Sequence, residues 1–125
     1  MDQDLRALLA LIAGSLIGPG KAAAVYDHAR RRRFAVGGVL TGGEVNVYDF
    51  DSGSGIVGRG FEGVFLLAHV PSRTYVELGI EGTEFRGTLQ GSRTRFSGMR
   101  VASVVTLFDS DVKRMFVYSL LIRQS

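Results

Sequence analysis

The sequence predicts a mainly β fold: an antiparallel up-and-down barrel of about ten strands, preceded by an apolar N-terminal helix. Three observations predict it. A unit of about twenty residues recurs five times, apolar and polar residues alternate within each unit, and glycine is abundant while proline is scarce, at 17 and 2 residues. Such a composition is typical of tight turns between hydrogen-bonded strands. A two-sheet sandwich with the helix packed across an open end is the alternative arrangement.

The repeat is recognised by an aromatic residue, an aspartate directly after it, and a further aromatic or apolar residue eight positions after the first. Tyr26, Asp27 and Phe34 form one clear copy, and Phe108 with Phe116 repeats it. The leading positions are 26, 48, 67, 88 and 108, which gives spacings of 22, 19, 21 and 20 residues. We interpret each copy as a hairpin in which the leading residue faces the residue eight later. The aspartate starts the turn, because its carboxylate can accept backbone N–H groups.

Alternation assigns one face of each strand to the core. The residues predicted to face inward are Val45, Val47, Val57, Val64, Leu66, Val76, Leu78, Ile80, Phe85, Leu89, Met99, Val101, Val105, Leu107, Val117 and Leu121. The opposite face carries polar and charged residues, among them Glu44, Glu77, Arg86 and Arg100, and is expected to meet water. This charged outer face argues against a membrane barrel, whose outer band is apolar.

Residues 3–16 are predicted to form a helix that has little polar face. A helix that is apolar all round is normally buried, and a ten-strand barrel is slightly too wide for its side chains alone to fill. We therefore expect this helix to plug the barrel or to cap one end. The apolar run is too short to span a bilayer, so no transmembrane insertion is expected. One domain then covers residues 1–125, with the helix in 1–18 and the hairpins in 21–123.

Composition narrows the classes of function and location. The chain has no cysteine, which excludes disulfides, a thiol nucleophile and Cys-bound zinc. The acidic start, Met1-Asp2-Gln3-Asp4, is unlike the basic start of a secretory signal, so a cytoplasmic location is expected. The net charge is +3, and thirteen of the fifteen basic residues are arginine. A GC-rich, bacterial-like genome also produces such an arginine bias.

No catalytic, metal or cofactor motif fits its predicted context. The run from Gly53 to Gly58 matches G-x-G-x-x-G, but a returning strand follows where a nucleotide site requires a helix. The run from Asp49 to Gly53 is similar to the start of a calcium loop, yet the twelfth position is Gly60 rather than glutamate. Ser110 and Lys113 match S-x-x-K on a hairpin tip, where no helix turn brings them together. No cofactor and no metal are therefore predicted.

Charge at the hairpin tips is the strongest functional signal. The candidate ligand- or anion-binding residues are Arg30, Arg31, Arg32, Arg33, Arg73, Arg93, Arg95, Lys113 and Arg114, together with His28 and His69. The nine cations stand against five aspartates, a difference of +4, while the rest of the chain carries −1. Such a basic end can hold phosphate, nucleic acid or an anionic membrane surface. The favoured interpretation, however, is that aspartate and arginine pair across each turn and contribute only solubility.

The two histidines each follow a leading position by two residues, so both are predicted on the same rim. We interpret them as solvated loop residues, with an acid–base role at the barrel mouth as the alternative. The leading expectation for function is a non-enzymatic module that binds an apolar ligand or a protein partner. An anion-binding module and an enzyme are the alternatives. The hairpin length is that of MORN repeats, but only Phe85-Arg86-Gly87 approximates their Tyr-x-Gly start, so no family is predicted.

Overall fold

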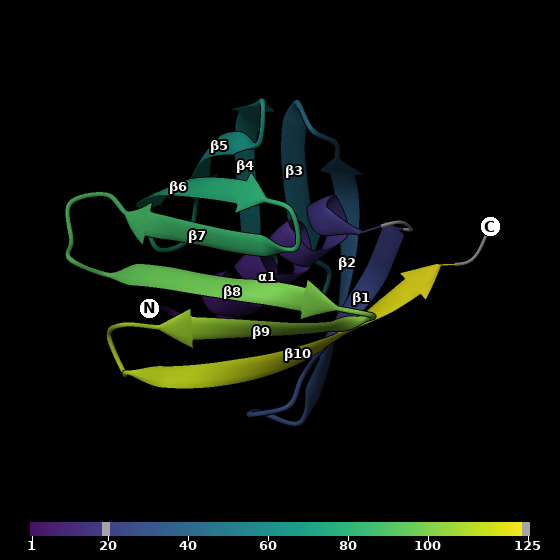
Figure 1. Ribbon diagram of the computed structural model, residues 1–125. Coiled ribbons are helices and arrows are strands. Elements are labelled where there is room, and N and C mark those ends of the chain that lie inside the picture. Colours follow the sequence, from purple (N-terminus) through teal and green to yellow (C-terminus); the bar gives the residue numbers. More distant parts are fainter. Residues whose placement is uncertain (19–20, 124–125) are drawn as a thin grey trace.

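A closed barrel of ten antiparallel strands surrounds a single helix in the computed structural model, which describes residues 1–18 and 21–123 (Figure 1). The elements are α1 (Gln3–Ile17), β1 (Lys21–Asp27), β2 (Arg32–Leu40), β3 (Glu44–Asp49), β4 (Gly55–Phe61), β5 (Val64–His69), β6 (Thr74–Glu81), β7 (Glu84–Leu89), β8 (Arg95–Val101), β9 (Val104–Asp109) and β10 (Arg114–Arg123). Each strand pairs with its neighbour in the chain, and β1 pairs with β10 to close the barrel. The predicted up-and-down barrel is confirmed, and the sandwich is not formed.

Helix α1 fills the barrel, as the lack of a polar face predicted. Every residue from Leu5 to Gly14 is buried, and the helix contacts at least eight of the ten strands. The side chain of Asp2 caps its N-terminus by accepting the N–H groups of Asp4 and Leu5, at 2.9 and 3.0 Å. At the other end the guanidinium of Arg100 donates to the carbonyl oxygen of Gly14 at 2.8 Å, where a cation complements the helix dipole.

Glycines inside the barrel leave room for rings on the adjacent strand. Gly87 lies directly opposite Phe96, and Gly98 directly opposite Phe85. A Cβ atom at Gly87 would lie 2.3 Å from the Phe96 ring, and one at Gly98 would lie 1.9 Å from the carbonyl oxygen of Thr106. These contacts are too short for any side chain. Glycine therefore allows the wall to bend tightly while the ring opposite covers the exposed backbone.

The predicted hairpin register is wrong by one residue. Phe34 pairs with Val25 rather than with Tyr26, and Phe116 pairs with Leu107 rather than with Phe108. Because side chains alternate, this shift turns the leading residue outward and the predicted partner inward. The strands end at residues 27, 49, 69, 89 and 109, so the spacings are 22, 20, 20 and 20. The third leading position is accordingly 68 and not 67.

The predicted inner face is confirmed on some strands and wrong on others. It is confirmed for Val45, Val47, Val76, Leu78, Phe85, Leu89, Val105 and Leu107, which are buried, while Ile80 is partly buried. It is wrong for Val57, Val64, Leu66, Met99, Val101, Val117 and Leu121, which are 37% to 66% exposed. Arg100, predicted to face water, lies inside. The strands that were misassigned carry apolar residues on both faces, so alternation could not choose between them.

No helix in residues 1–18 or 21–123 is long and apolar enough to cross a membrane.

Candidate functional site

All five hairpin tips lie at one end of the barrel, because consecutive strands are antiparallel and every odd-numbered strand runs to the same end. We call this the tip end; it comprises the loops after β1, β3, β5, β7 and β9. The N-terminus of α1 is also there, and the amine of Met1 lies 2.6 Å from Oδ2 of Asp111, beside the tip between β9 and β10 (Figure 1). The opposite end holds the C-terminus of the helix and Arg100.

A buried cluster of polar side chains, formed by Arg6, Asp109 and Tyr118, holds the helix in place below the tips. Nη1 of Arg6 donates to Oδ2 of Asp109 at 2.9 Å, and Nε donates to the hydroxyl of Tyr118 at 3.1 Å. The guanidinium also lies 3.5 Å from the centre of the Phe116 ring. Burial raises the pKa of Tyr118 to about 12, an effect that the charge of Arg6 only partly opposes. This group escaped sequence analysis, although a lone arginine in an otherwise apolar buried helix is a signal that could have revealed it.

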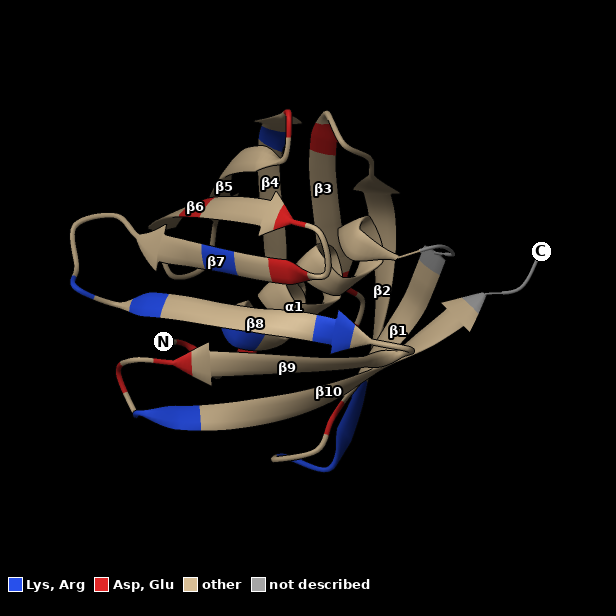
Figure 2. Ribbon diagram, viewed as in Figure 1, with Lys and Arg blue, Asp and Glu red and all other residues tan. Residues whose placement is uncertain are grey.

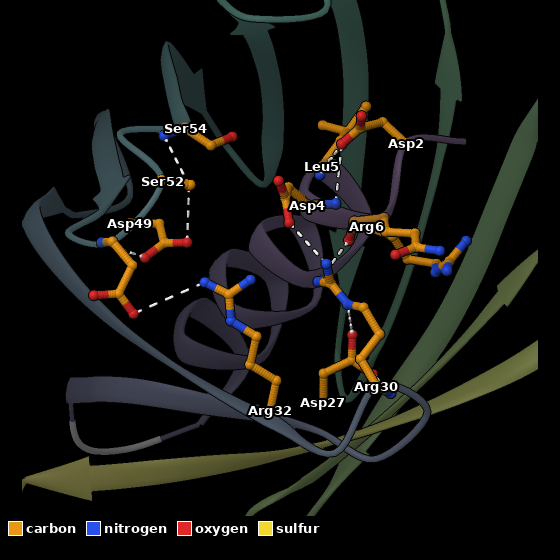
Figure 3. Close-up of polar contacts among 12 residues, drawn as sticks. Asp2, Asp4, Leu5, Arg6, Asp27, Arg30, Arg32, Asp49, Ser52 and Ser54 are labelled. Atoms are coloured by element: carbon orange, nitrogen blue, oxygen red, sulfur yellow. Dashed lines mark hydrogen bonds and ion pairs between the residues drawn. The ribbon is translucent and has the colours of Figure 1, made fainter.

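Arg30 is held by two carboxylates rather than left free at the tip. Its Nε lies 2.7 Å from Oδ2 of Asp27, and its Nη1 lies 2.8 Å from Oδ1 of Asp4 on the helix (Figure 3). Arg32 reaches Asp51 at 3.8 Å, with both side chains exposed. The expectation that arginine and aspartate pair across the tips therefore applies to these two arginines.

The aspartates that start the turns have the structural role expected of them. Oδ1 of Asp27 accepts the N–H of Ala29 at 3.0 Å, and Oδ1 of Asp109 accepts the N–H of Asp111 at 2.9 Å. Asp49 does the same for the residue two positions on, at 2.9 Å. Asp27, Asp49 and Asp109 are buried, so these carboxylates serve the turns and are not exposed to a ligand.

His69 occupies on β5 the place that aspartate has in those three turns. The residue two positions on is Pro71, which has no N–H to donate, so a carboxylate there would lack its partner. The His69 ring instead hydrogen-bonds the hydroxyls of Ser54, at 2.7 Å from Nε2, and Ser72, at 2.6 Å from Nδ1. It is 1% exposed, and burial lowers its pKa against the raising effect of Asp2 and Asp4. Its interpretation as a solvated loop residue is wrong.

His28 is exposed in the tip after β1, and its Nε2 lies 2.7 Å from the hydroxyl of Ser119. Strands β2, β3 and β4 separate this tip from β5, so the two histidines are not brought into one site. Among residues 1–18 and 21–123, no three metal-ligating side chains gather around a common point.

Seven basic side chains at the tip end form no ion pair with any part of the chain that the structure describes. They are Arg31, Arg33, Arg73, Arg93, Arg95, Lys113 and Arg114, and all seven residues are exposed. Figure 2 shows the basic segments at the tips after β1, β7 and β9. We call these seven residues the free tip cations. Their charges are available to a partner, whereas Arg6 and Arg30 are engaged in holding the helix.

A crevice of about 580 Å³ lies between α1 and strands β1 to β3, and it extends from Leu40 and Thr41, at the end opposite the tips, to Phe50 in the tip after β3. Leu11 and Ser15 of the helix line it, together with apolar residues such as Val36, Val39 and Leu40. The hydroxyl oxygen of Ser15 is buried and has no hydrogen-bond partner in the described structure.

These features define the class of the protein: a small β-barrel closed around its own helix, with unpaired cations gathered at one end. Comparisons with protein-family models, with curated proteins and with solved structures find no match for the chain.

Proposed function

We propose that the chain is a non-enzymatic binding module that holds nucleic acid at its tip end. The observation that carries this proposal is the presence of seven free tip cations at one end of a closed barrel. Unpaired cations gathered on one surface create a positive potential that attracts a polyanion and releases its counterions on binding. The lack of cysteine is compatible with the reducing cytoplasm, and a cytoplasmic location would bring such a module within reach of nucleic acid.

The residue types at the tip end suit phosphate and bases. Six of the seven free tip cations are arginine, whose planar guanidinium can donate two parallel hydrogen bonds to one phosphate. One exposed aromatic side chain lies at the tip end: Phe50 is 62% exposed in the tip after β3. An exposed ring of this kind offers a stacking surface to unpaired bases, so we favour single-stranded nucleic acid.

Fluorescence anisotropy with a labelled single-stranded oligonucleotide tests the proposal. Binding should weaken steeply between about 50 and 200 mM salt, and removing one cation that neutralises a phosphate should reduce the logarithmic salt slope by about 0.7. Arg31→Ser with Arg33→Ser, or Arg93→Ser with Arg95→Ser, should lower both affinity and slope. Arg30 is left unchanged in these variants, because its two ion pairs hold the helix.

Arg86→Ser is the matched control, since Arg86 is exposed on the outer face of β7 and lies away from the tips. It should leave the salt slope unchanged. If the wild-type protein does not bind at low salt, or if the control weakens binding as much as the tip variants do, the proposed function is wrong.

A second candidate function is the binding of a small apolar molecule in the crevice beside α1. The unpartnered hydroxyl of Ser15 at its wall favours a ligand with one polar group on an apolar body, because a buried hydroxyl without a partner costs about 1–3 kcal/mol. Native mass spectrometry of the purified protein should then show a retained small molecule. Val39→Trp, at the exposed edge of the crevice, should reduce the fraction of protein that carries the small molecule. A spectrum that shows only the mass of the protein itself would rule out this candidate function.

Enzymatic chemistry at a barrel mouth receives no support from the described residues. Ser54 and His69 are hydrogen-bonded like a nucleophile and its base, but both are buried and the other ring nitrogen meets Ser72 rather than a carboxylate. Neither residue lines the crevice.

A further inference from the structure

The outer face of β4, β5 and β6 exposes large apolar side chains to solvent. Strand pairing arranges its outward side chains in three rows. The rows are Phe61–Val64–Gly79, Arg59–Leu66–Glu77 and Val57–Ala68–Tyr75. Phe61 is 76% exposed, Tyr75 61% and Leu66 59%. Apolar side chains grouped in this way on a barrel wall are typical of an interaction surface.

The middle row has opposite charges on the two sides of an apolar residue. Arg59 and Glu77 flank Leu66 across the strands, both are exposed, and neither forms an ion pair with the residues that the structure describes. This pattern is complementary to itself. Consider a second copy placed face to face by a two-fold axis that is parallel to β5 and lies between the two faces. Leu66 then meets Leu66 of the other copy, and on either side Arg59 of one copy meets Glu77 of the other.

Under the same rotation, the first row is complementary to itself in shape. Phe61 of one copy then faces Gly79 of the other. Gly79 lines a hollow of about 660 Å³ on the outer wall, and a Cβ atom built on it would meet nothing nearer than the carbonyl oxygen of Arg86 at 3.9 Å. A large exposed ring therefore faces a position with no side chain, and Val57 faces Tyr75 in the third row.

We propose that two copies of this chain associate through the outer faces of β4, β5 and β6, with the two-fold axis along β5. A two-fold axis across the strands is disfavoured, because it would place Arg59 against Arg59 and Glu77 against Glu77, and like charges in contact oppose association. Rotation about β5 keeps the strand direction, so both tip ends point the same way. The free tip cations of the two copies then lie on one side of the dimer.

Sedimentation equilibrium of the purified chain, without nucleic acid, is the first test. The wild type should be a dimer whose dissociation constant rises by about 100-fold or more in Arg59→Glu and in Glu77→Arg, because each change sets two like-charge pairs against each other. An equimolar mixture of these two variants should form a heterodimer, since every pair across the interface is again opposite. The double variant Arg59→Glu/Glu77→Arg should dimerise by itself.

Gly79→Leu tests the interface without disturbing the fold of the single chain. A Cβ atom at position 79 has space in the isolated chain, so thermal unfolding monitored by circular dichroism should be unchanged at concentrations where the chain is monomeric. The dimer should weaken, because the leucine side chain would occupy the space that Phe61 of the other copy takes. Leu66→Lys should also give monomers. Val117→Lys on the outer face of β10 is the control, and should leave the dimer intact.

Cross-linking tests the direction of the axis, because the natural chain has no cysteine. Packed sheets lie about 10 Å apart, which suits a short bismaleimide. Val64→Cys and Ala68→Cys should each cross-link to their own copy. Cross-linking only in a mixture of the two would overturn the proposed axis, and a wild-type chain that stays monomeric would overturn the dimer. Neither of these two results would bear on the proposed nucleic-acid binding, because that binding is tested separately with the variants of the free tip cations.

Discussion

Arg6 on α1 and Asp109 at the end of β9 form a buried ion pair, Nη1 to Oδ2 2.9 Å, although 103 residues separate them in the chain. Arg6 is 6% exposed and Asp109 0%. The pair joins the first element of the fold to one of the last. It sets the depth at which the helix sits, because a shift along the barrel axis would leave both charges buried without partners.

Removing one partner of this pair should destabilise the barrel strongly. Arg6→Leu leaves the buried Asp109 carboxylate with the amine of Met1, 3.6 Å away, as its remaining cationic partner. The free energy of unfolding, measured in urea, should fall by up to about 3–5 kcal/mol. The double variant Arg6→Leu/Asp109→Asn should recover part of the loss, since asparagine is uncharged and can still accept the N–H of Asp111. A single variant as stable as the wild type would show that the pair has no such role.

Deleting residues 1–17 should abolish the folded state. The helix supplies a row of fully buried side chains, including Leu8, Leu9, Leu11 and Ile12, and the barrel without them would enclose an empty apolar space. Circular dichroism should show loss of the cooperative transition, and a dye that binds exposed apolar surface should fluoresce. An unchanged melting temperature would contradict the assignment of α1 as the plug of the barrel.

His69 should make the barrel less stable in mild acid. Burial lowers its pKa below the ordinary 6.5, so the unfolded chain binds the proton before the folded one does. Its contribution is fully present above pH 6.5 and is lost as the pH falls from 6.5 through the folded-state pKa. Urea unfolding at a series of pH values should show this loss, and His69→Gln should remove it. His69→Asp should destabilise at neutral pH, because Pro71 offers its carboxylate no N–H.

Two glycines of the barrel wall, Gly79 on β6 and Gly98 on β8, should respond differently to substitution by alanine. At Gly98 the new Cβ atom would lie 1.9 Å from a backbone oxygen and 2.5 Å from the Phe85 ring, so Gly98→Ala should cost about 1–3 kcal/mol or more. At Gly79 the nearest atom is 3.9 Å away, so Gly79→Ala should be neutral or stabilise by about 0.4–1 kcal/mol, because alanine restricts the unfolded chain. Equal effects in thermal unfolding of the two variants would contradict this account of the barrel's curvature.

Much of the architecture is determined by the sequence itself. A period of about twenty residues, with glycine and aspartate at the turns, predicts consecutive hairpins, and a helix without a polar face must find a buried place. The gathering of the basic tips at one end follows from the same periodicity, since consecutive antiparallel strands bring alternate turns together. These properties depend on local pattern, and local pattern is visible in one chain.

Other properties were decided only by the tertiary structure. The register came out one residue away from the pairing of Tyr26 with Phe34, because Val25 and Tyr26 are adjacent apolar residues and the pattern alone cannot choose which of them pairs with Phe34. Likewise β4, β5, β8 and β10 are apolar on both faces, and alternation alone cannot orient them. The sequence also did not show which basic residues are engaged. Arg6 and Arg30 are held by Asp109, Asp27 and Asp4, while the seven free tip cations form no ion pair within residues 1–18 and 21–123. Which charges meet depends on how the barrel closes around its helix, and that closure joins residues a hundred positions apart.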